Sequence, residues 1–345
     1  MLHHLANEWN HERSTVAVFL DIEKAFDRVW YAGLIFKLIN SKTPPAIVQL
    51  VASFLHGRDF YVSVELTTSQ KRTISAGVPQ GSCLSPALYG FYTDDIPTLV
   101  GSLHPWERDV TLALYADDSA FFATSRNEDV AARRMQRMLD LLPAWLDKWR
   151  MAVNVGKTAA LLVARRRHSA EILQLRGQEI EWKTSVKYLG VHIDRSLSMA
   201  PQGEHAINQT RTVRALLRPV LSSKLPLRTK IGVYKTYLRS RLTYAAPAWY
   251  ALCSATTKKQ MQIQQNIALL CTGAGRFVRN DVIARDLGVD SVGDFVAMSA
   301  RRMFDCADNS SHTHLHGIAS LHARPPDHEI RGPLKLTPRD LIRPD

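Results

Sequence analysis

The sequence has no long hydrophobic runs and no closely paired cysteines. No apolar run approaches the ~20 residues that a transmembrane helix needs. The polar, His-rich residues 1–13 have no apolar signal-peptide core. The four cysteines form no Cys-x-x-Cys pair, which favours reduced thiols in an intracellular compartment. We therefore expect a protein that is soluble, not secreted and without a membrane partner.

Positive charge is present in excess. Lys and Arg number 44 against 32 Asp and Glu, a formal net charge of +12. Such a surplus favours a polyanionic partner, because neutralising phosphates releases counterions, although many basic proteins bind no nucleic acid. With 345 residues, 46% of them hydrophobic, the chain can form about two domains, or one domain with subdomains.

Two acidic sites each follow a run of strand-forming residues. Asp117 and Asp118 lie between two apolar runs, as at the turn of a hairpin, and Asp21 and Asp27 follow the apolar residues 15–20. A single Asp at a strand end is more often a turn or cap residue. Two such strand ends together indicate one divalent-metal site, because Mg²⁺ prefers carboxylate oxygens. The backbone carbonyl of Ile22 is well placed to add another oxygen.

The remaining pattern predicts an α+β protein. Residues 77–86 contain two Gly and two Pro and should form a shaped loop. Apolar periodicity predicts strands over 158–163 and 186–193, a hairpin within 60–76, and helices over 31–40, 46–55, 128–150, 206–217, 228–241 and 258–271. We expect three parts: residues 1–200, a helical region 201–275, and a partly loose segment 276–345.

Five motifs resemble, in order and spacing, the palm motifs of reverse transcriptases, most closely those of non-LTR retrotransposons of the Jockey type. They are residues 19–27, 77–86, 115–118, 149–158 and 187–194. The resemblance implies a polymerase palm whose antiparallel sheet packs on helices, with partial fingers and then an α-helical thumb at 201–275. It further implies an RNA-directed DNA polymerase that extends a primer 3′-OH with dNTPs on an RNA template, by two-metal nucleotidyl transfer.

The resemblance also assigns catalytic roles. Asp21, Asp117 and Asp118 would be the ligands of Mg²⁺ or Mn²⁺, the second Asp of the pair being the less direct one. Lys157 would lie near the triphosphate and could protonate the leaving pyrophosphate. Taken alone, Lys157 is more often an ordinary solvated surface lysine.

Other residues would contact the nucleotide and the primer. Ile22, Phe26 and Gln80 would form the nucleotide site, with Phe26 as the steric gate against a 2′-hydroxyl and Gln80 touching nucleotide and template. Tyr188-Leu189-Gly190 resembles the primer grip. Each has a structural alternative: Phe26 as core, Gln80 as a turn-capping amide, and residues 188–190 as a buried strand.

Cations with interleaved tyrosines mark the predicted thumb helices. They suit a surface that follows a nucleic-acid backbone without reading sequence, and a solvated helix face explains them equally well. The cations are Arg211, Arg214, Arg218, Lys224, Arg228, Lys230, Lys235, Arg239 and Arg241, and the tyrosines are Tyr234, Tyr237 and Tyr244. A zinc site at Cys306, His312, His314 and His316 is disfavoured, because no second cysteine lies at knuckle spacing.

The chain departs from the family pattern at its start. It begins almost at the first catalytic strand, so we expect an N-terminally truncated enzyme that lacks most of its fingers. The alternative is an inactive, element-derived remnant that binds nucleic acid. An RNA-dependent RNA polymerase is disfavoured by Phe26 and the context of Asp117. The resemblance implies nuclear action at the step of element integration.

Overall fold

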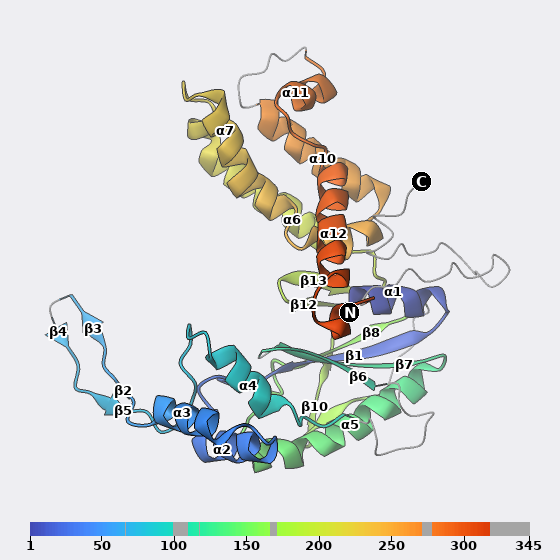
Figure 1. Cartoon of the computed structure of the whole chain (residues 1–345). Helices are drawn as coiled ribbons and strands as arrows, with labels where there is room; N and C mark the ends of the chain where they lie inside the picture. Colours follow the sequence, from blue (N-terminus) through green and yellow to red (C-terminus); the bar gives the residue numbers. More distant parts are fainter. Residues whose placement is uncertain (66, 99–109, 117, 166–170, 271–277, 318–345) are drawn as a thin grey trace. The chain divides into compact units, whose positions relative to one another are not determined.

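The computed structural model describes residues 1–65, 67–98, 110–116, 118–165, 171–270 and 278–317 (Figure 1). The chain divides into two compact units. Residues 15–162 and 168–183 form one, called the sheet unit here, and residues 1–14, 163–167 and 184–345 form the other, the helical unit.

A five-stranded sheet organises the sheet unit. Its spatial order is β11 (Glu181–Trp182), β8 (Ala159–Val163), β1 (Ser14–Asp21), β7 (Asp118–Ser125) and β6 (Val110–Tyr115). β6 and β7 pair antiparallel, whereas β11 pairs with β8 in parallel. The central strands β1 and β7 are buried along nearly their whole length, as the apolar residues 15–20 predicted.

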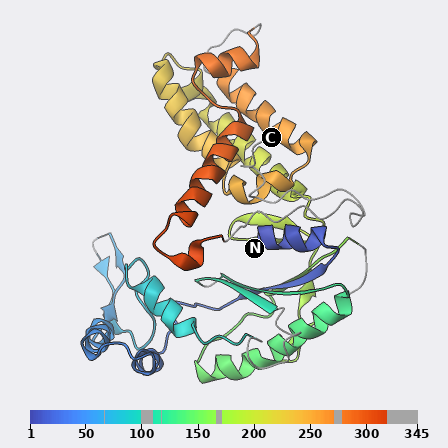
Figure 2. The ribbon, with the colours of Figure 1, turned by 45° about the vertical axis from the view of Figure 1, so that its right-hand side comes forward.

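Helix α5 (Glu128–Lys148) packs on β7 and runs along one face of the sheet (Figures 1 and 2). It begins where the Asn127 side chain accepts a hydrogen bond of 2.9 Å from the Asp129 amide, which satisfies a donor of the first turn. Met135, Leu139 and Leu142 are buried on one stripe at the predicted helical spacing. Pro143 lies within the helix without ending it.

Three further helices and three small ladders complete the described part of the sheet unit. α2 (Tyr31–Asn40) packs against both α3 (Pro45–Leu55) and α4 (Ser85–Thr93). The predicted hairpin consists of the short exposed ladders β2 (Asp59–Phe60) with β5 (Arg72–Thr73) and β3 (Ser63–Val64) with β4 (Thr67–Thr68), and it extends away from α3 (Figure 1). β9 (Gln174–Leu175) and β10 (Gln178–Glu179) form another hairpin.

The helical unit contains one hairpin and a set of helices. The hairpin joins β12 (Ser185–Tyr188) to β13 (Val191–Asp194), so residues 186–193, predicted as strand, turn back on themselves. Leu189 and Gly190 make this turn with φ of 48° and 79°. The helices are α1 (Leu2–Asn10), α6 (Ala200–Leu221), α7 (Leu227–Val233), α8 (Ser240–Leu242), α9 (Ala246–Trp249), α10 (Ala255–Leu270), α11 (Asn280–Asp286) and α12 (Val292–Asp308), with 3₁₀ turns η3 (Tyr250–Leu252) and η4 (Thr313–Leu315).

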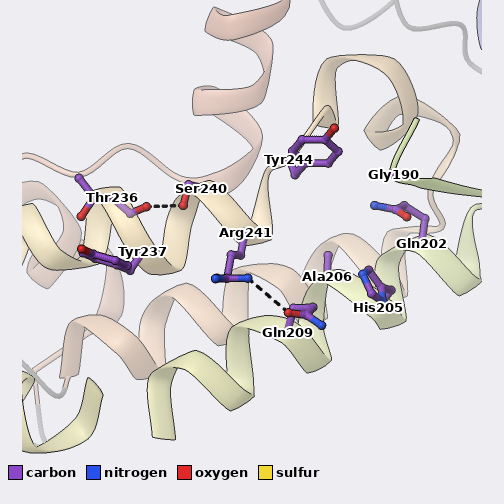
Figure 3. Close-up of a pocket in the computed structure, with 10 residues that line it drawn as sticks. All are labelled: Gly190, Gln202, His205, Ala206, Gln209, Thr236, Tyr237, Ser240, Arg241 and Tyr244. Atoms are coloured by element: carbon purple, nitrogen blue, oxygen red, sulfur yellow. Dashed lines mark hydrogen bonds between the residues drawn. The ribbon is translucent and has the colours of Figure 1, made fainter. Parts of the chain in front are cut away.

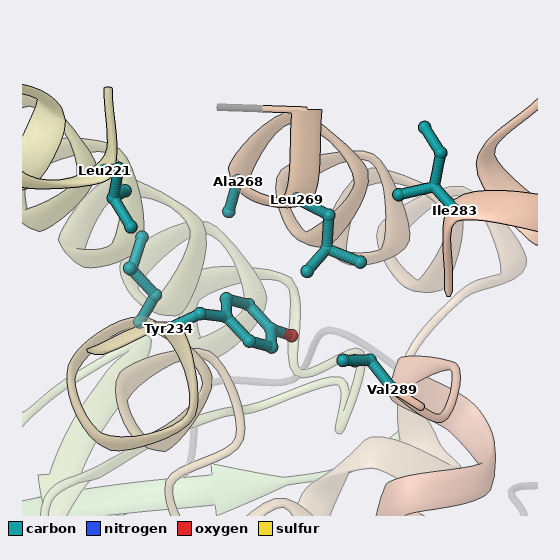
Figure 4. Packing of buried hydrophobic residues seen from close by; sticks show 7 residues of the cluster. Leu221, Tyr234, Ala268, Leu269, Ile283 and Val289 are labelled. Atoms are coloured by element: carbon teal, nitrogen blue, oxygen red, sulfur yellow. The ribbon is translucent and has the colours of Figure 1, made fainter. Parts of the chain in front are cut away.

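A π-helical segment, η2 (Tyr234–Arg239), separates α7 from α8. The sequence predicted one continuous helix over 228–241. Tyr234 is buried in a cluster with Leu221, Leu269 and Val289 (Figure 4). Its hydroxyl donates a hydrogen bond of 2.8 Å to the Gln265 side chain, and burial raises its pKa. The π turn therefore keeps Tyr234 in the core.

The C-terminal segment 276–345, expected to be partly loose, is described over residues 278–317. Two helices form within this range, α11 and α12, although the sequence pattern there is weak. Within the described ranges, no helix combines the length and the apolar character needed to cross a membrane.

Candidate active site

Asp21 and Asp118 lie at the same end of the sheet. β1 and β7 are neighbours, and the hydroxyls of Thr15, near the start of β1, and Thr124, near the end of β7, are 3.1 Å apart. The two strands therefore run antiparallel, which brings the last residue of β1, Asp21, beside the first residue of β7, Asp118. Asp21 is partly exposed and Asp118 is exposed, so both carboxylates can reach a ligand.

A tight hairpin presents the second carboxylate. The ladder of β6 and β7 ends with Tyr115 paired to Asp118, which leaves two residues for the turn. Ala116 has φ of 53°, a left-handed conformation that two-residue hairpin turns require and that a side chain disfavours. Asp117, predicted as a metal ligand, lies outside the described residues. The strain at Ala116 is typical of a functional turn.

Backbone hydrogen bonds fix Asp21 to the segment that carries Lys157. The Asn154 amide donates to the Asp21 carbonyl at 2.9 Å, the Glu23 amide donates to Ala152 at 2.9 Å, and the Asp21 amide donates to the Thr158 hydroxyl at 3.4 Å. The bonds to the Asp21 and Ala152 carbonyls flank the antiparallel bridge between Ile22 and Val153. The Ile22 carbonyl takes part in neither bond.

Lys157 lies beside the predicted metal ligand. Its Nζ is 3.9 Å from Oδ2 of Asp21, and the two side chains are 71% and 43% exposed. An exposed pair at this distance contributes little to stability. The Lys157 ammonium therefore lies next to the Asp21 carboxylate without forming a strong structural salt bridge, and separating the two groups costs little free energy.

The segment around Phe26 is tied to the Gly/Pro loop. The Val78 amide donates to the Phe26 carbonyl at 2.8 Å, and Nε2 of Gln80 lies 3.4 Å from Oδ1 of Asp27. The Phe26 ring stacks on Tyr89, with centroids 4.8 Å apart and planes 30° apart. Phe26 remains only partly buried and Gln80 is exposed. The structure thus brings the two predicted nucleotide-site residues together.

Gly77 allows this close approach. Its φ is +92°, and a Cβ built there would lie 2.8 Å from the Asp27 Cα. Only glycine fits both the left-handed conformation and the contact. Sequence reasoning identified the loop from its composition, but it missed Asp27 as the partner of Gln80 and Tyr89 as the support of Phe26; no local pattern links residues so far apart in the chain.

The three predicted primer-grip residues belong to the helical unit. Tyr188 is buried, Leu189 and Gly190 form the turn, and the Tyr244 hydroxyl donates to the Leu189 carbonyl at 3.3 Å. A Cβ on Gly190 would lie 2.9 Å from the Tyr244 ring. The sequence did not indicate that Tyr244 supports this turn.

Some of the predicted thumb cations are engaged inside the helical unit. Arg214 donates to Gln264 at 2.8 Å, the Arg239 guanidinium lies 4.0 Å from the centroid of Phe295, and Lys230 is buried. Contacts within the protein thus distinguish these three from exposed thumb cations such as Arg211 and Arg218.

The donors at the sheet end fit a hard divalent ion. Asp21 and Asp118 offer carboxylate oxygens from adjacent rigid strands, and Ile22 adds a nearby carbonyl. Among the described side chains, no three from His, Cys, Asp or Glu form a complete ligand group. The third predicted ligand, Asp117, is outside that set. The reverse transcriptase family in general uses divalent metal ions.

Comparison with known proteins matches residues 2–193 to the family described as reverse transcriptase (RNA-dependent DNA polymerase). The chain is 34% identical over 292 residues to the RNA-directed DNA polymerase from mobile element jockey of Drosophila melanogaster, covering 84% of this chain and 32% of that protein. It is 33% identical over 330 residues to the probable RNA-directed DNA polymerase from transposon X-element of the same species, covering 94% and 35%.

The chain thus spans about a third of the length of these curated relatives. Among solved structures, apo telomerase from Candida tropicalis aligns with a TM-score of 0.42 and 13% identity over 91% of this chain and 55% of that one. The relatives confirm the predicted resemblance to Jockey-type elements, and the family match covers all five motifs except the last residue of the fifth. The chain belongs to the reverse transcriptase family.

Proposed function

We propose that this chain carries the catalytic core of an RNA-directed DNA polymerase of a non-LTR retrotransposon, which extends a DNA primer with dNTPs on an RNA template. The observation that carries the proposal is the meeting of Asp21 and Asp118 at one end of adjacent antiparallel strands, with Lys157 3.9 Å from Asp21. This is the donor arrangement that metal-assisted phosphoryl transfer requires.

Asp21, Asp117 and Asp118 would hold Mg²⁺, or Mn²⁺ in its place, with help from the Ile22 carbonyl. When bound, the metal supplies activation of the primer 3′-hydroxyl and neutralises charge on the leaving pyrophosphate. Lys157 binds the triphosphate and donates a proton to the pyrophosphate oxygen as it leaves. The exposed Lys157 ammonium is suited to this role, because breaking its 3.9 Å contact with Asp21 costs little free energy.

The nucleotide would lie against Phe26 and Gln80. The Phe26 ring, fixed by its stack on Tyr89, blocks the space where a 2′-hydroxyl would project. The Gln80 amide, in contact with the Asp27 carboxylate, would touch the nucleotide and template. Such preoriented side chains reduce the entropy lost on binding.

Three segments would divide the remaining work. Residues 1–200 form the palm with partial fingers, residues 201–275 the thumb, and residues 276–345 a post-polymerase segment. Tyr188, Leu189 and Gly190 would grip the primer end, and exposed thumb cations such as Arg211 and Arg218 would follow the nucleic-acid backbone. The resemblance to mobile elements supports action in the nucleus during integration.

Primer extension on poly(rA)/oligo(dT) with Mg²⁺ tests the proposal. Wild type should incorporate dTTP, and Asp21→Asn should reduce incorporation by at least a thousandfold, because it removes a charged metal ligand. Binding of the same template–primer by Asp21→Asn should persist, which separates loss of chemistry from loss of folding. If wild type incorporates no more than Asp21→Asn while both bind RNA, the chain is the inactive nucleic-acid-binding remnant instead.

A further inference from the structure

A cavity of about 420 Å³ opens in the helical unit between α6 and the η2–α8 segment, beside the turn of β12 and β13 (Figure 3). Its lining includes one guanidinium, Arg241, one imidazole, His205, and the rings of Tyr237 and Tyr244. None of the ten lining residues is acidic. The volume falls in the range of small-molecule sites, roughly 300–1,000 Å³.

The π-helical segment shapes one wall of this cavity. Within η2, Tyr234 and Leu238 are buried in the core, whereas Tyr237 faces the cavity and is 56% exposed. Arg239 stacks on Phe295 outside the lining. π turns are rare and are frequent at functional sites. The same segment therefore packs Tyr234 and Leu238 into the core and exposes the Tyr237 ring to the cavity.

The second tyrosine, Tyr244, follows α8 in the chain. Tyr244 is also 56% exposed, and its hydroxyl is anchored on the Leu189 carbonyl at 3.3 Å. Figure 3 shows Arg241 in the middle of the lining, with Tyr237 and Tyr244 to either side. Nη1 of Arg241 lies 3.5 Å from the side-chain oxygen Oε1 of Gln209. This contact is long and uses one nitrogen, so most N–H donors of the guanidinium are available to another acceptor.

These groups match the chemistry of a nucleotide. A guanidinium is a strong partner for a phosphate, with which it forms paired hydrogen bonds. Exposed aromatic faces stack with any nucleobase without reading its sequence. The absence of carboxylates in the lining removes the repulsion that would exclude an anion. A nucleobase must leave the helical stack to enter a cavity, so a paired base inside a duplex is excluded.

We propose that this cavity binds one unpaired nucleotide of a nucleic-acid strand, its phosphate on Arg241 and its base against Tyr237 or Tyr244. The proposal rests on the proposed function only in taking a polynucleotide as the ligand. RNA and DNA strands share the required phosphate and base, and the experiment distinguishes them.

Equilibrium binding without dNTP or divalent metal tests this inference. Fluorescein-labelled oligo(rU) and oligo(dT), each as a single strand and annealed to its complement, are titrated with protein at one salt concentration. Tyr237→Ala and Arg241→Gln should each weaken single-strand binding about tenfold, the loss expected for one stacked base or one phosphate contact. Duplex binding should change by less than about twofold. The strand that responds, rU or dT, identifies the source of the nucleotide.

Two matched controls keep the result interpretable. Tyr237→Phe retains the ring and should bind like wild type. Arg301→Gln removes an exposed cation on α12, outside the cavity, and measures the loss from charge alone. Unchanged single-strand binding by Tyr237→Ala, equal losses for single strand and duplex, or equal losses for Arg241→Gln and Arg301→Gln would each overturn the proposal. Because no nucleotide is incorporated, failure of polymerase activity does not affect the outcome.

Discussion

The side-chain amide of Gln80 lies 3.4 Å from the carboxylate of Asp27, the residue that directly follows Phe26. Gln80 and Asp27 are 53 positions apart in the chain. A backbone hydrogen bond from the Val78 amide to the Phe26 carbonyl joins the same two segments, and together the two contacts form a junction between them. The junction therefore couples the two side chains that we propose contact the incoming nucleotide. Asp27 acts in this arrangement as a positioning residue.

Removing the Asp27 acceptor should impair nucleotide binding. We expect Asp27→Ala to raise the KM for dNTP by roughly three- to tenfold, the value of one modest hydrogen bond, with little change in kcat. Asp27→Asn keeps an acceptor oxygen and should remain close to wild type. Steady-state primer extension measures both. Equal KM values for Asp27→Ala and wild type would contradict a positioning role for Asp27.

The glycines of the loop offer a matched pair for stability. Gly77 and Gly81 both have positive φ, but a Cβ on Gly77 would lie 2.8 Å from the Asp27 Cα, whereas nothing lies within 4 Å of one on Gly81. We expect Gly81→Ala to lower the free energy of unfolding by about 1 kcal/mol and Gly77→Ala by roughly 2–4 kcal/mol. Urea denaturation checks this order. If Gly81→Ala lowers the free energy of unfolding as much as Gly77→Ala does, the positive φ alone explains the loss and the contact with Asp27 contributes nothing.

The fold was predictable where the signal is local. The apolar residues 15–20 predicted β1, the spacing over 128–150 predicted α5, and the acids at 117 and 118 predicted a hairpin turn. Each prediction depends on a period or a turn that the neighbouring residues determine. For the same reason the sequence could anticipate that Asp21 and Asp118 each lie at the end of a strand.

The contacts that support the site could not be predicted in this way. η2 has the same apolar spacing as an α-helix, so periodicity cannot reveal a π turn. Lys37 provides a second example: the sequence places it in the predicted helix 31–40, but only the structure shows that it is buried against Trp145 and Trp149 from a distant segment. Burial of such a residue depends on tertiary packing, which a single sequence does not encode locally.

The surroundings of Lys37 lead to a stability prediction. Its ammonium donates to the Tyr92 carbonyl and the Asp95 carboxylate and lies 3.8 Å from the Trp149 ring centroid. Burial lowers the pKa of Lys37, and the hydrogen bond that its ammonium donates to Asp95 opposes that effect. We expect Asp95→Asn to lower the free energy of unfolding by about 1.5–3 kcal/mol, because it removes the charge that compensates a buried cation.

The neighbouring acid provides the control for that experiment. Asp94 is exposed, and Asp94→Asn should change the free energy of unfolding by less than about 0.5 kcal/mol. Both variants are compared by urea denaturation at neutral pH. If the Asp95→Asn variant is as stable as the Asp94→Asn variant, the buried ammonium is satisfied by Tyr92 and Trp149 without its counter-ion.

Asp194 should make the helical unit sensitive to acid. This buried carboxylate at the end of β13 accepts hydrogen bonds from Ser196, Ser198 and the Met199 amide at the start of α6, the last at 2.7 Å. Burial alone would raise its pKa, but these donors together outweigh burial and hold the pKa below its ordinary value. A carboxyl group with a lowered folded-state pKa stabilises the fold above its unfolded-state pKa of about 4, and that contribution is lost as the pH falls through the folded-state value.

We therefore expect Asp194→Asn to lower the free energy of unfolding by roughly 1–3 kcal/mol at pH 7, and the difference from wild type to shrink below about pH 4. Denaturation curves at a series of pH values measure this convergence. Glu204→Gln removes an exposed carboxylate from α6, and its free energy of unfolding should differ from that of wild type by the same small amount at every pH. A difference between Asp194→Asn and wild type that stays constant down to the acid limit would mean that Asp194 stabilises the turn through its shape alone, not through its charge.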